Sequence, residues 1–344
     1  MGRTSRWHAL CALTVTAMIA PVAAAAASPM RSPRSPAPMA CKKVSPDGRE
    51  LSCAVALPAG VKVRSANVRV LLPADYARTK RPYPVVFMLH GVGDDETAWT
   101  NPQRGDLARL TASCRAIFVM PDGGSGPVAG WYSDWVDNSF QYETFHTRVL
   151  PAAIDATFRT TGKGRRAVAG MSMGGFGALS YAARHRGLFK AAASYSGFVD
   201  TMFGAPVSGE SYDIQGQNPV FSLGTPSRRV WGTQGSTPEV WRAHNPYDQA
   251  AALAGVAVFL ASGTGTPGGP QGDNPAMAAN YGSESYVGHL NDRFAARLQE
   301  VGVPFSDGRY LGGYHDWVYW RAAFTASLPV LMPPVAAASR GCGS

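Results

Sequence analysis

The residues best suited to chemistry are a serine and a histidine that each follow a short apolar run. Ser172 lies in Gly170-Met171-Ser172-Met173-Gly174, between an apolar run at 167–169 and a helical pattern at 174–185. A serine between a strand and a helix, flanked by glycines, is typical of a nucleophile elbow, whose sharp turn exposes the hydroxyl. An ordinary glycine-rich turn is the alternative in a chain with 38 glycines. We expect Ser172 to be a nucleophile.

A serine hydroxyl needs a base within hydrogen-bond reach to remove its proton. His315 lies in a glycine-rich loop after the last predicted strand, where the elbow arrangement places its base. A cap for the helix that begins near Trp317 is the alternative role for His315. His90 is the rival base, but it directly precedes Gly91, and we expect it to support the loop there. The other histidines are expected on helices or facing solvent: His146, His185, His244 and His289.

The acid that orients the imidazole has to lie between the serine and the histidine in the chain. Asp273 and Glu284 both fall in the segment that we expect to be a loop after the strand at 256–261. Position alone does not choose between these two carboxylates. Asp200, after the preceding strand, is a third candidate.

The charge that develops when a hydroxyl attacks a carbonyl requires backbone N–H donors. One donor is expected from Met173, the residue after the nucleophile. The other is expected from Val92, in the loop His90-Gly91-Val92-Gly93 that follows the strand at 85–89. No grouping of cysteine and histidine has the spacing of a zinc site, so we expect neither a metal nor a cofactor.

Continuous apolar runs alternate with helical patterns along the chain. The predicted strands lie at 68–72, 85–89, 116–120, 167–169, 191–196, 256–261 and from 304 onward, and the predicted helices at 143–158, 174–185, 287–301 and 317–328. This alternation predicts an α/β fold with one doubly wound, mostly parallel sheet. Active residues gather at the carboxyl ends of such strands, where His90, Ser172, Gly263 and His315 fall. Residues 198–245 are long for a connection, and we expect a partial lid.

The ends of the chain differ in composition from its centre. Residues 1–27 read as a secretory signal, with Arg3 and Arg6 before an apolar stretch and small residues. An uncleaved anchor is the alternative. We expect a Pro/Ser-rich linker at 28–40, a catalytic domain at 41–332 and a tail at 333–344. With 45% apolar and 16% charged residues, the chain is expected to be globular. The predicted signal implies a secreted protein without stable membrane insertion.

The cysteines fit an exported protein. Four remain once Cys11 leaves with the signal, and an even number suggests disulfides. Cys41 and Cys53 bracket a turn signal at 45–48 and are expected to form a disulfide that contributes roughly 3 kcal/mol. Cys114 and Cys342 are available to each other, but the sequence does not fix their pairing.

The positive charges are scattered. The formal net charge of +9 becomes +7 when Arg3 and Arg6 are removed, and no basic stripe with interleaved aromatic residues is present. We therefore expect no nucleic-acid partner. A loose association with anionic cell-wall polymers is the alternative to a plain solvated surface.

The chain resembles the putative esterase family of α/β-hydrolases, and within it the antigen 85 mycolyltransferase and esterase D-like group. The likeness covers roughly residues 84–328. Its motifs are Tyr132-Ser133-Asp134-Trp135, Tyr142-Glu143-Thr144-Phe145, the serine motif, Val230-Trp231-Gly232, the segments 263–267 and 272–274, and His315-Asp316-Trp317-Val318-Tyr319-Trp320.

The resemblance implies roles for particular residues. Ser172 is the nucleophile and His315 the base by similarity. Glu284 is favoured over Asp273 as the catalytic acid, because the family's carboxylate lies ten residues before a phenylalanine, here Phe294. Trp317 falls on a position that lines the family's substrate pocket, and we place His90 with it among the residues next to substrate.

One departure bears on the reaction. The antigen 85 enzymes carry Asp-Gly-Leu-Arg at the oxyanion loop, where the Asp and Arg bind trehalose. This chain has His90-Gly91-Val92-Gly93, which resembles the general esterases of the wider family. The resemblance thus implies hydrolysis of an ester or acyl-lipid substrate, with acyl transfer to a sugar or glycerol hydroxyl as the alternative. A non-catalytic cell-wall binding protein and a peptidase are further alternatives, and the sequence does not give the oligomeric state.

Overall fold

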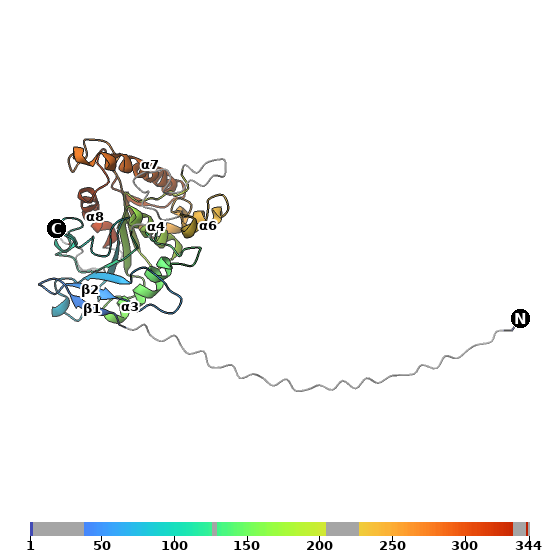
Figure 1. Ribbon diagram of the computed structural model, residues 1–344, viewed down its shortest axis with the longest axis horizontal. Helices are drawn as coiled ribbons and strands as arrows, with labels where there is room; N and C mark the ends of the chain where they lie inside the picture. The colour runs from blue at the N-terminus through green and yellow to red at the C-terminus, as the bar shows by residue number, and fades with distance from the viewer. Residues whose placement is uncertain (3–37, 126–128, 204–226, 333–341, 343–344) are drawn as a thin grey trace, which may run out of the picture. The chain divides into compact units, whose positions relative to one another are not determined.

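A sheet of nine strands forms the centre of the described residues, which in this computed structural model are 1–2, 38–125, 129–203, 227–332 and 342 (Figure 1). The chain divides into the units Met1–Ser35 and Pro36–Ser344, and every element below belongs to the second. The strands are β1 (Ala40–Lys43), β2 (Glu50–Ala54), β3 (Asn67–Leu71), β4 (Val85–Leu89), β5 (Ile117–Pro121), β6 (Arg166–Met171), β7 (Ala191–Tyr195), β8 (Ala257–Ala261) and β9 (Phe305–Asp307). Residues 3–37 are not among the described residues. The secretory signal at 1–27 and the linker at 28–40 therefore remain predictions.

The strand order is β1-β2-β3-β5-β4-β6-β7-β8-β9. Pairing is antiparallel from β1 through β5 and parallel from β5 to β9. The central strands β4 to β7 are buried at every position, as their continuous apolar sequence predicted. This mostly parallel sheet confirms the predicted α/β-hydrolase fold.

Helices cover both faces of the sheet. Their bounds are α1 (Leu107–Leu110), α2 (Tyr142–Thr144), α3 (Leu150–Thr157), α4 (Met173–Arg184), α5 (Ser227–Trp231), α6 (Pro238–His244), α7 (Ala278–Glu300) and α8 (Trp317–Leu331), with a π-helical turn at Phe145–Val149 and 3-10 turns at Tyr76–Arg78, Ala250–Leu253 and Pro275–Met277. Side chains of α3, α4 and α7 pack in one core cluster and those of α1 and α8 in the other. Residues 204–226 of the expected lid lie outside the described residues.

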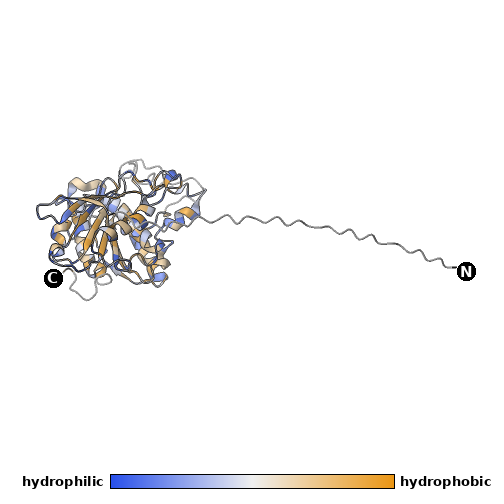
Figure 2. Cartoon of the chain, turned by 90° about the horizontal axis from the view of Figure 1, so that it is seen from below, coloured by the Kyte–Doolittle hydropathy of each residue, from blue (hydrophilic) through white to orange (hydrophobic). Residues whose placement is uncertain are grey.

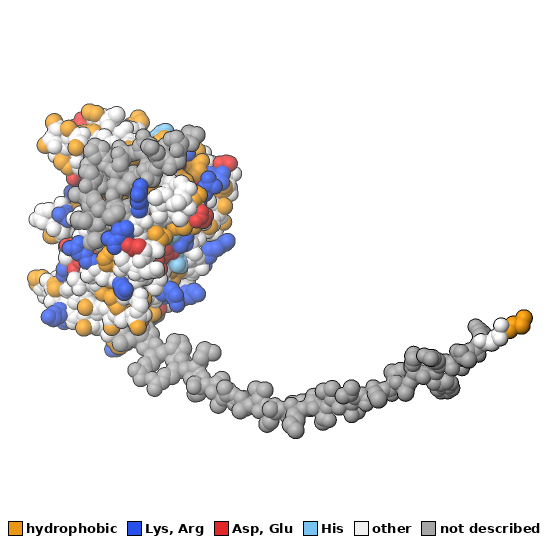
Figure 3. All heavy atoms as spheres, turned by 45° about the vertical axis from the view of Figure 1, so that its right-hand side comes forward, with side chains coloured by type: hydrophobic (Ala, Val, Ile, Leu, Met, Phe, Trp, Pro, Cys, Tyr) orange, Lys and Arg blue, Asp and Glu red, His pale blue; other side chains and the backbone are white. Residues whose placement is uncertain are grey.

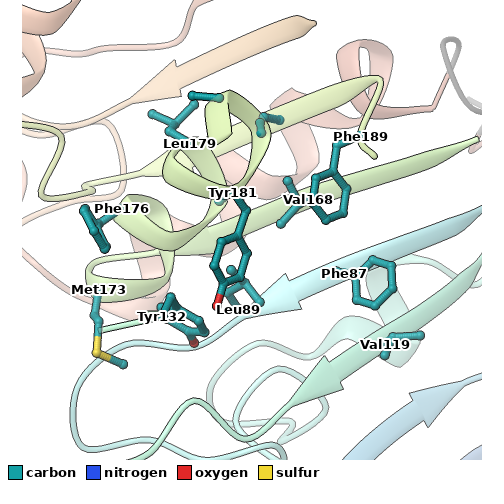
Figure 4. Close-up of a cluster of buried hydrophobic side chains, with 14 of the residues drawn as sticks. Phe87, Leu89, Val119, Tyr132, Val168, Met173, Phe176, Leu179, Tyr181 and Phe189 are labelled. Carbon is teal, nitrogen blue, oxygen red and sulfur yellow. The ribbon is translucent and has the colours of Figure 1, made fainter. Parts of the chain in front are cut away.

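The strands supply alternate side chains to the two faces. In β4, Val85, Phe87 and Leu89 belong to the cluster under α4, whereas Val86 and Met88 face α8. Figure 4 shows Phe176, Leu179 and Tyr181 of α4 lying over the strands, and Figure 2 shows the apolar sheet inside a more polar shell. The nucleophile helix α4 is therefore fixed over the parallel strands by a continuous apolar layer.

Two disulfides tie distant segments to this core. Cys41 and Cys53 join β1 to β2, as predicted, and Cys114 joins Cys342 across 228 residues. None of the helices in the described part of the chain has the length and apolar character needed to cross a bilayer. On the face shown in Figure 3, Lys and Arg are spread among other side chains rather than gathered in a stripe.

A buried carboxylate joins the far end of α4 to two other helices. Glu143 of α2 accepts hydrogen bonds from Arg184 Nε and Nη2 at 2.8 and 3.2 Å, and its Oε1 lies 2.7 Å from His185 Nε2. His244 Nε2, at the end of α6, is 3.4 Å from the other oxygen. Burial would raise the pKa of Glu143, but its hydrogen bonds to His185, His244 and Arg184 hold the pKa well below its usual range.

We expect Glu143→Gln to lower the free energy of unfolding at neutral pH by about 3 kcal/mol, because the buried carboxylate is the ion-pair partner of Arg184 and the amide leaves that guanidinium unpaired. The pKa of Glu143 is lowered on folding, so its contribution is present above the ordinary value of 4.5 and lost as the pH falls below it. Urea unfolding of both proteins between neutral and acid pH should thus show the gap closing. Exposed Glu239→Gln is the control, expected within about 0.5 kcal/mol of the parent. A gap that stays constant with pH would contradict this.

Candidate active site

Ser172 occupies a strained turn between β6 and α4. Its backbone has φ 54° and ψ −122°, a conformation that non-glycine residues rarely adopt outside functional sites. The turn is held at both ends: the Ser172 amide donates to the Tyr195 carbonyl at 2.9 Å, and its carbonyl accepts from the Gly175 amide at 3.0 Å. This is the geometry of the elbow that the sequence predicted.

The two flanking glycines are required by close backbone contacts. A Cβ on Gly170 would lie 2.4 Å from the carbonyl carbon of Gly174, and one on Gly174 would lie 2.3 Å from the Leu89 carbonyl oxygen. Neither neighbour is a flexible side chain, so neither contact can be relieved cheaply. The nucleophile turn and the end of β4 therefore touch through their backbones.

Gly174→Ala is expected to destabilise the protein by about 2–3 kcal/mol, because the added methyl overpacks the turn. Gly282→Ala is the matched control, since Gly282 lies in α7 with nothing within 4 Å of the added Cβ. That substitution should stabilise by about 0.5–1 kcal/mol, the usual gain in a helix. Urea unfolding measures both, and equal effects would show that the contact with Leu89 does not matter.

A histidine and a carboxylate from the last third of the chain reach Ser172. His315 Nε2 is 3.0 Å from Ser172 Oγ, and His315 Nδ1 is 2.8 Å from Glu284 Oε2. All three side chains are buried, Glu284 fully and the other two with at most 9% exposure. A hydroxyl, an imidazole and a carboxylate in this chain of hydrogen bonds can move a proton from the oxygen to the ring.

The structure places Glu284 in a helix rather than in the expected loop. Helix α7 begins at Ala278, nine residues before the predicted start, because the apolar periodicity that predicted the helix is absent from its first two turns. The other acid candidates lie elsewhere. Asp273 accepts from the Gly268 amide at 2.8 Å and the Tyr281 hydroxyl at 3.0 Å, and Asp200 pairs with Arg293 at 3.1 Å.

The histidine loop is held by its own backbone partners. The His315 amide donates to the Asn280 carbonyl at 3.0 Å, and Asn280 Nδ2 donates to the His315 carbonyl at 2.7 Å. The cap of α8 is the next residue, Asp316, which accepts from the Val318 amide. His315 is therefore free of the capping role and directed at Ser172.

Two further residues contact the acid and the histidine, and the sequence analysis missed both. Ser196 Oγ donates to Glu284 Oε1 at 2.8 Å, beside the Gly263 amide at 2.6 Å. Trp320 Nε1 lies 3.2 Å from Ser196 Oγ, and its ring stands edge-on to His315 with centroids 4.9 Å apart. Ser196 is buried and has φ 48°. Its place directly after a buried strand was the available signal.

The loop after β4 passes over the nucleophile. A Cβ on Gly91 would lie 3.3 Å from Ser172 Cβ. Within the described part of the chain, neither the Val92 amide nor the Met173 amide donates a hydrogen bond. Two unpaired donors on the segments that flank Ser172 Oγ are what a developing oxyanion requires.

His90 supports this loop from below. The ring is 1% exposed, its Nε2 accepts from the Gly123 amide at 2.7 Å, and its Nδ1 lies 2.8 Å from the Gly91 carbonyl. Both nitrogens are thus engaged by backbone, which corrects the placement of His90 beside substrate. Trp317, the first residue of α8, is half-buried against Trp99 and Trp320, at 5.0 and 5.4 Å between ring centroids.

Two other histidines were expected to face solvent, and that expectation is wrong. His146 is 2% exposed and bonds Tyr181 Oη and the Asp122 carbonyl, both at 2.9 Å. Burial lowers the pKa of His146 to about 3, so the ring is neutral. His244 is also buried, beside Glu143. In the described part of the chain, no group of three or more His, Cys, Asp or Glu side chains is placed to hold a metal ion.

Comparisons with known proteins place the site in a family context. The family model described as "Putative esterase" matches residues 63–331. Esterase Rv1288 of Mycobacterium tuberculosis is 36% identical over 254 residues, which cover 72% of this chain and 52% of that protein. The chain thus spans about half the length of this relative. The diacylglycerol acyltransferase/mycolyltransferase Ag85C of Mycobacterium avium is 29% identical over 223 residues, 61% of this chain and 59% of that one.

Solved structures share the architecture. A ferulic acid esterase has a TM-score of 0.56 and 26% identity, covering 78% of this chain and 92% of that chain. MPT51 of Mycobacterium tuberculosis has a TM-score of 0.64 and 22% identity, covering 86% of this chain and 99% of that chain. The likeness to MPT51 extends to the fold alone.

Proposed function

The chain belongs to the putative esterase family, and we propose that it is a secreted serine esterase that cleaves carboxylic esters through an acyl-enzyme intermediate. The observation that carries the proposal is the chain of contacts from Ser172 Oγ through His315 to Glu284, at 3.0 and 2.8 Å. The relatives named as esterases agree with it. Two disulfides favour an oxidising compartment, and hence export.

The proposed reaction has two halves. Ser172 Oγ attacks the ester carbonyl while its proton passes to His315 Nε2, and Glu284 stabilises the imidazolium through Nδ1–H. The Val92 and Met173 amides hold the oxyanion. When the tetrahedral intermediate collapses, the leaving alcohol takes the proton from His315, and the acyl group stays on Ser172. Water then gives a proton to His315 and attacks the acyl-enzyme. When this second intermediate collapses, His315 returns the proton to Ser172 Oγ and the acid is released.

Acyl transfer is the second candidate, supported by the identity to Ag85C. A sugar or glycerol hydroxyl would replace water in the second half-reaction, with the same residues. The loop His90-Gly91-Val92-Gly93 offers no charged side chain to an acceptor, since His90 is buried beneath it. We therefore prefer hydrolysis.

The test compares product formation from a panel of esters: p-nitrophenyl acetate, octanoate and palmitate, and methyl ferulate, with and without trehalose or glycerol. The proposal expects free acid as the main product and labelling of the protein by a fluorophosphonate. Transfer product exceeding free acid would favour the acyltransferase. A folded protein that neither reacts with the probe nor cleaves any ester would favour a binding protein, and cleavage of peptide amides in preference to esters would favour a peptidase.

Ser196 is proposed as a positioning residue for the acid. Ser196→Ala removes one of two hydrogen bonds to Glu284 Oε1 and is expected to lower kcat about tenfold, with KM unchanged, as for one lost bond to a charged group. Ser194→Ala is the matched control, because Ser194 is equally buried and its hydroxyl has no hydrogen-bond partner among the residues that the structure describes. Its kcat should stay within about twofold. A parallel rise in KM would point to general distortion instead.

A further inference from the structure

A half-open cavity with a mixed polar and apolar lining lies beside Gly263, whose amide donates to the acid Glu284. Its volume is about 320 Å³. The loop after β8, the middle of α7 and the loop after β9 line it, through Ser262, Gly263, Thr264, Gly288, Asp292, Asp307, Arg309, Tyr310 and Leu311. Gly263 lines the cavity and donates its amide to Glu284 Oε1 at 2.6 Å, so this residue joins the cavity to the acid. The proposed mechanism uses none of the charged groups in it.

Two carboxylates and one guanidinium set the charge of the cavity. Arg309 donates from Nε and Nη2 to the two oxygens of Asp307, at 2.9 and 2.6 Å, and from Nη1 to Asp292 Oδ1 at 2.5 Å. The excess of one negative charge disfavours an anion. The guanidinium between the carboxylates disfavours a metal cation.

Several hydrogen-bonding groups in the cavity remain unused. Asp292 Oδ2 and the Tyr310 hydroxyl have no hydrogen-bond partner in the described residues, and the Arg309 fork keeps two of its five N–H donors. Burial, and then the charge of Glu284, raise the pKa of Tyr310 well above its usual range, so this hydroxyl stays a donor. Residues with unused acceptors and donors therefore line one small space.

An exposed apolar side chain is part of the cavity lining. Leu311 is 80% exposed, the most exposed large apolar residue in the described ranges apart from Met1. A sugar ring matches this combination, because its hydroxyls both donate and accept while its C–H face is apolar. A cavity of this size holds one such ring. The carboxylates that line it disfavour an acyl chain.

We propose that this cavity is a saccharide-binding subsite that takes one neutral sugar unit beside the acid of the active site. The ligand's vicinal hydroxyls bond Asp292 and Arg309, and its apolar face covers Leu311. The inference goes beyond the proposed esterase activity and does not depend on it, since sugar binding requires neither Ser172 nor turnover.

The experiment is a ¹H–¹⁵N NMR titration of the Ser172→Ala protein with cellobiose, xylobiose and maltose. At least one sugar is expected to bind with a Kd on the order of 1 mM and to shift the amides of Gly263, Thr264 and Leu311. Asp292→Asn and Leu311→Ser should each weaken that binding about fivefold or more, the loss of one good contact. Glu300→Gln is the matched control, an exposed carboxylate on the same helix, and should leave the Kd unchanged.

Three results would overturn the subsite. The first is no saturable shift at these amides with any of the three sugars. The second is an equal Kd in the parent and in both cavity variants. The third is a stronger response to inorganic phosphate or to cadaverine than to sugar. Because the titration uses a protein without the nucleophile, a failure here is distinct from a failure of ester hydrolysis, which the wild-type protein reports.

Discussion

Ser172→Ala is expected to lower kcat for ester hydrolysis by about 10⁴–10⁶-fold, because removing the nucleophile of such a triad costs as much as removing all of its members. The fold should survive the change: the backbone contacts that hold the turn come from the amide and carbonyl of residue 172, not from its hydroxyl. The same protein should lose all labelling by a fluorophosphonate. Steady-state hydrolysis of a p-nitrophenyl ester and labelling followed on a gel measure the two effects.

The exposed serine Ser306, at the edge strand β9, provides the control for this prediction. Ser306→Ala should keep full activity and full labelling. If Ser172→Ala, with an unchanged unfolding curve, retained more than about a hundredth of the parent activity, another group would have to attack the ester, and the assigned nucleophile would be wrong.

Glu284→Gln is expected to lower kcat by about 10³–10⁴-fold, since an amide in place of the carboxylate favours the wrong tautomer of the imidazole. The neutral amide also leaves the imidazolium of the transition state without a counter-charge. The Ser196 hydroxyl and Gly263 amide, which donate to Glu284 Oε1, can still donate to the oxygen of glutamine, so the packing is retained. Measurement of kcat across pH, with an unfolding curve at each pH, separates chemistry from stability.

Asp273→Asn is the decisive comparison, because the sequence left Asp273 open as the acid. Its carboxylate holds the Gly268 amide and the Tyr281 hydroxyl on a surface loop, so activity should stay within about threefold. A large loss at Asp273 with little effect at Glu284 would reverse the assignment.

The central strands could be predicted from sequence to within two residues at each end. β4 and β7 are short apolar runs buried on both faces, and their length of five residues favours a central strand of a parallel sheet over a helix. The elbow was equally clear, because glycine is the only residue that fits at positions 170 and 174. Local chemistry decided both features.

The acid could not be chosen from the residues alone, because its helix begins with polar turns. The first two turns of α7 contain Gly282 and several polar residues, so the periodic apolar pattern starts only at Val287. The contacts that mark Glu284 come from Ser196 and Gly263, far away in the chain. The resemblance to the antigen 85 group favoured Glu284 where periodicity did not.

The burial of two histidines could not be predicted from the sequence for the same reason. The sequence around His146 is that of a surface position on a helix, but in the structure His146 contacts Tyr181 and the Asp122 carbonyl. His244 in the same way contacts Glu143. Polar side chains are buried only where they have hydrogen-bond partners. The fold brings these partners together from distant parts of the chain, so sequence spacing does not reveal them.

The Cys114–Cys342 bond encloses Ser172, Glu284 and His315 in a single covalent ring. One cut by a protease anywhere between residues 115 and 341 would leave an undivided molecule, which separates into two pieces only after reduction. A gel run without reductant would then show a full-sized band for a nicked protein. Such a nicked chain could keep its active residues together, and the loss of intact polypeptide would be a poor measure of the loss of enzyme.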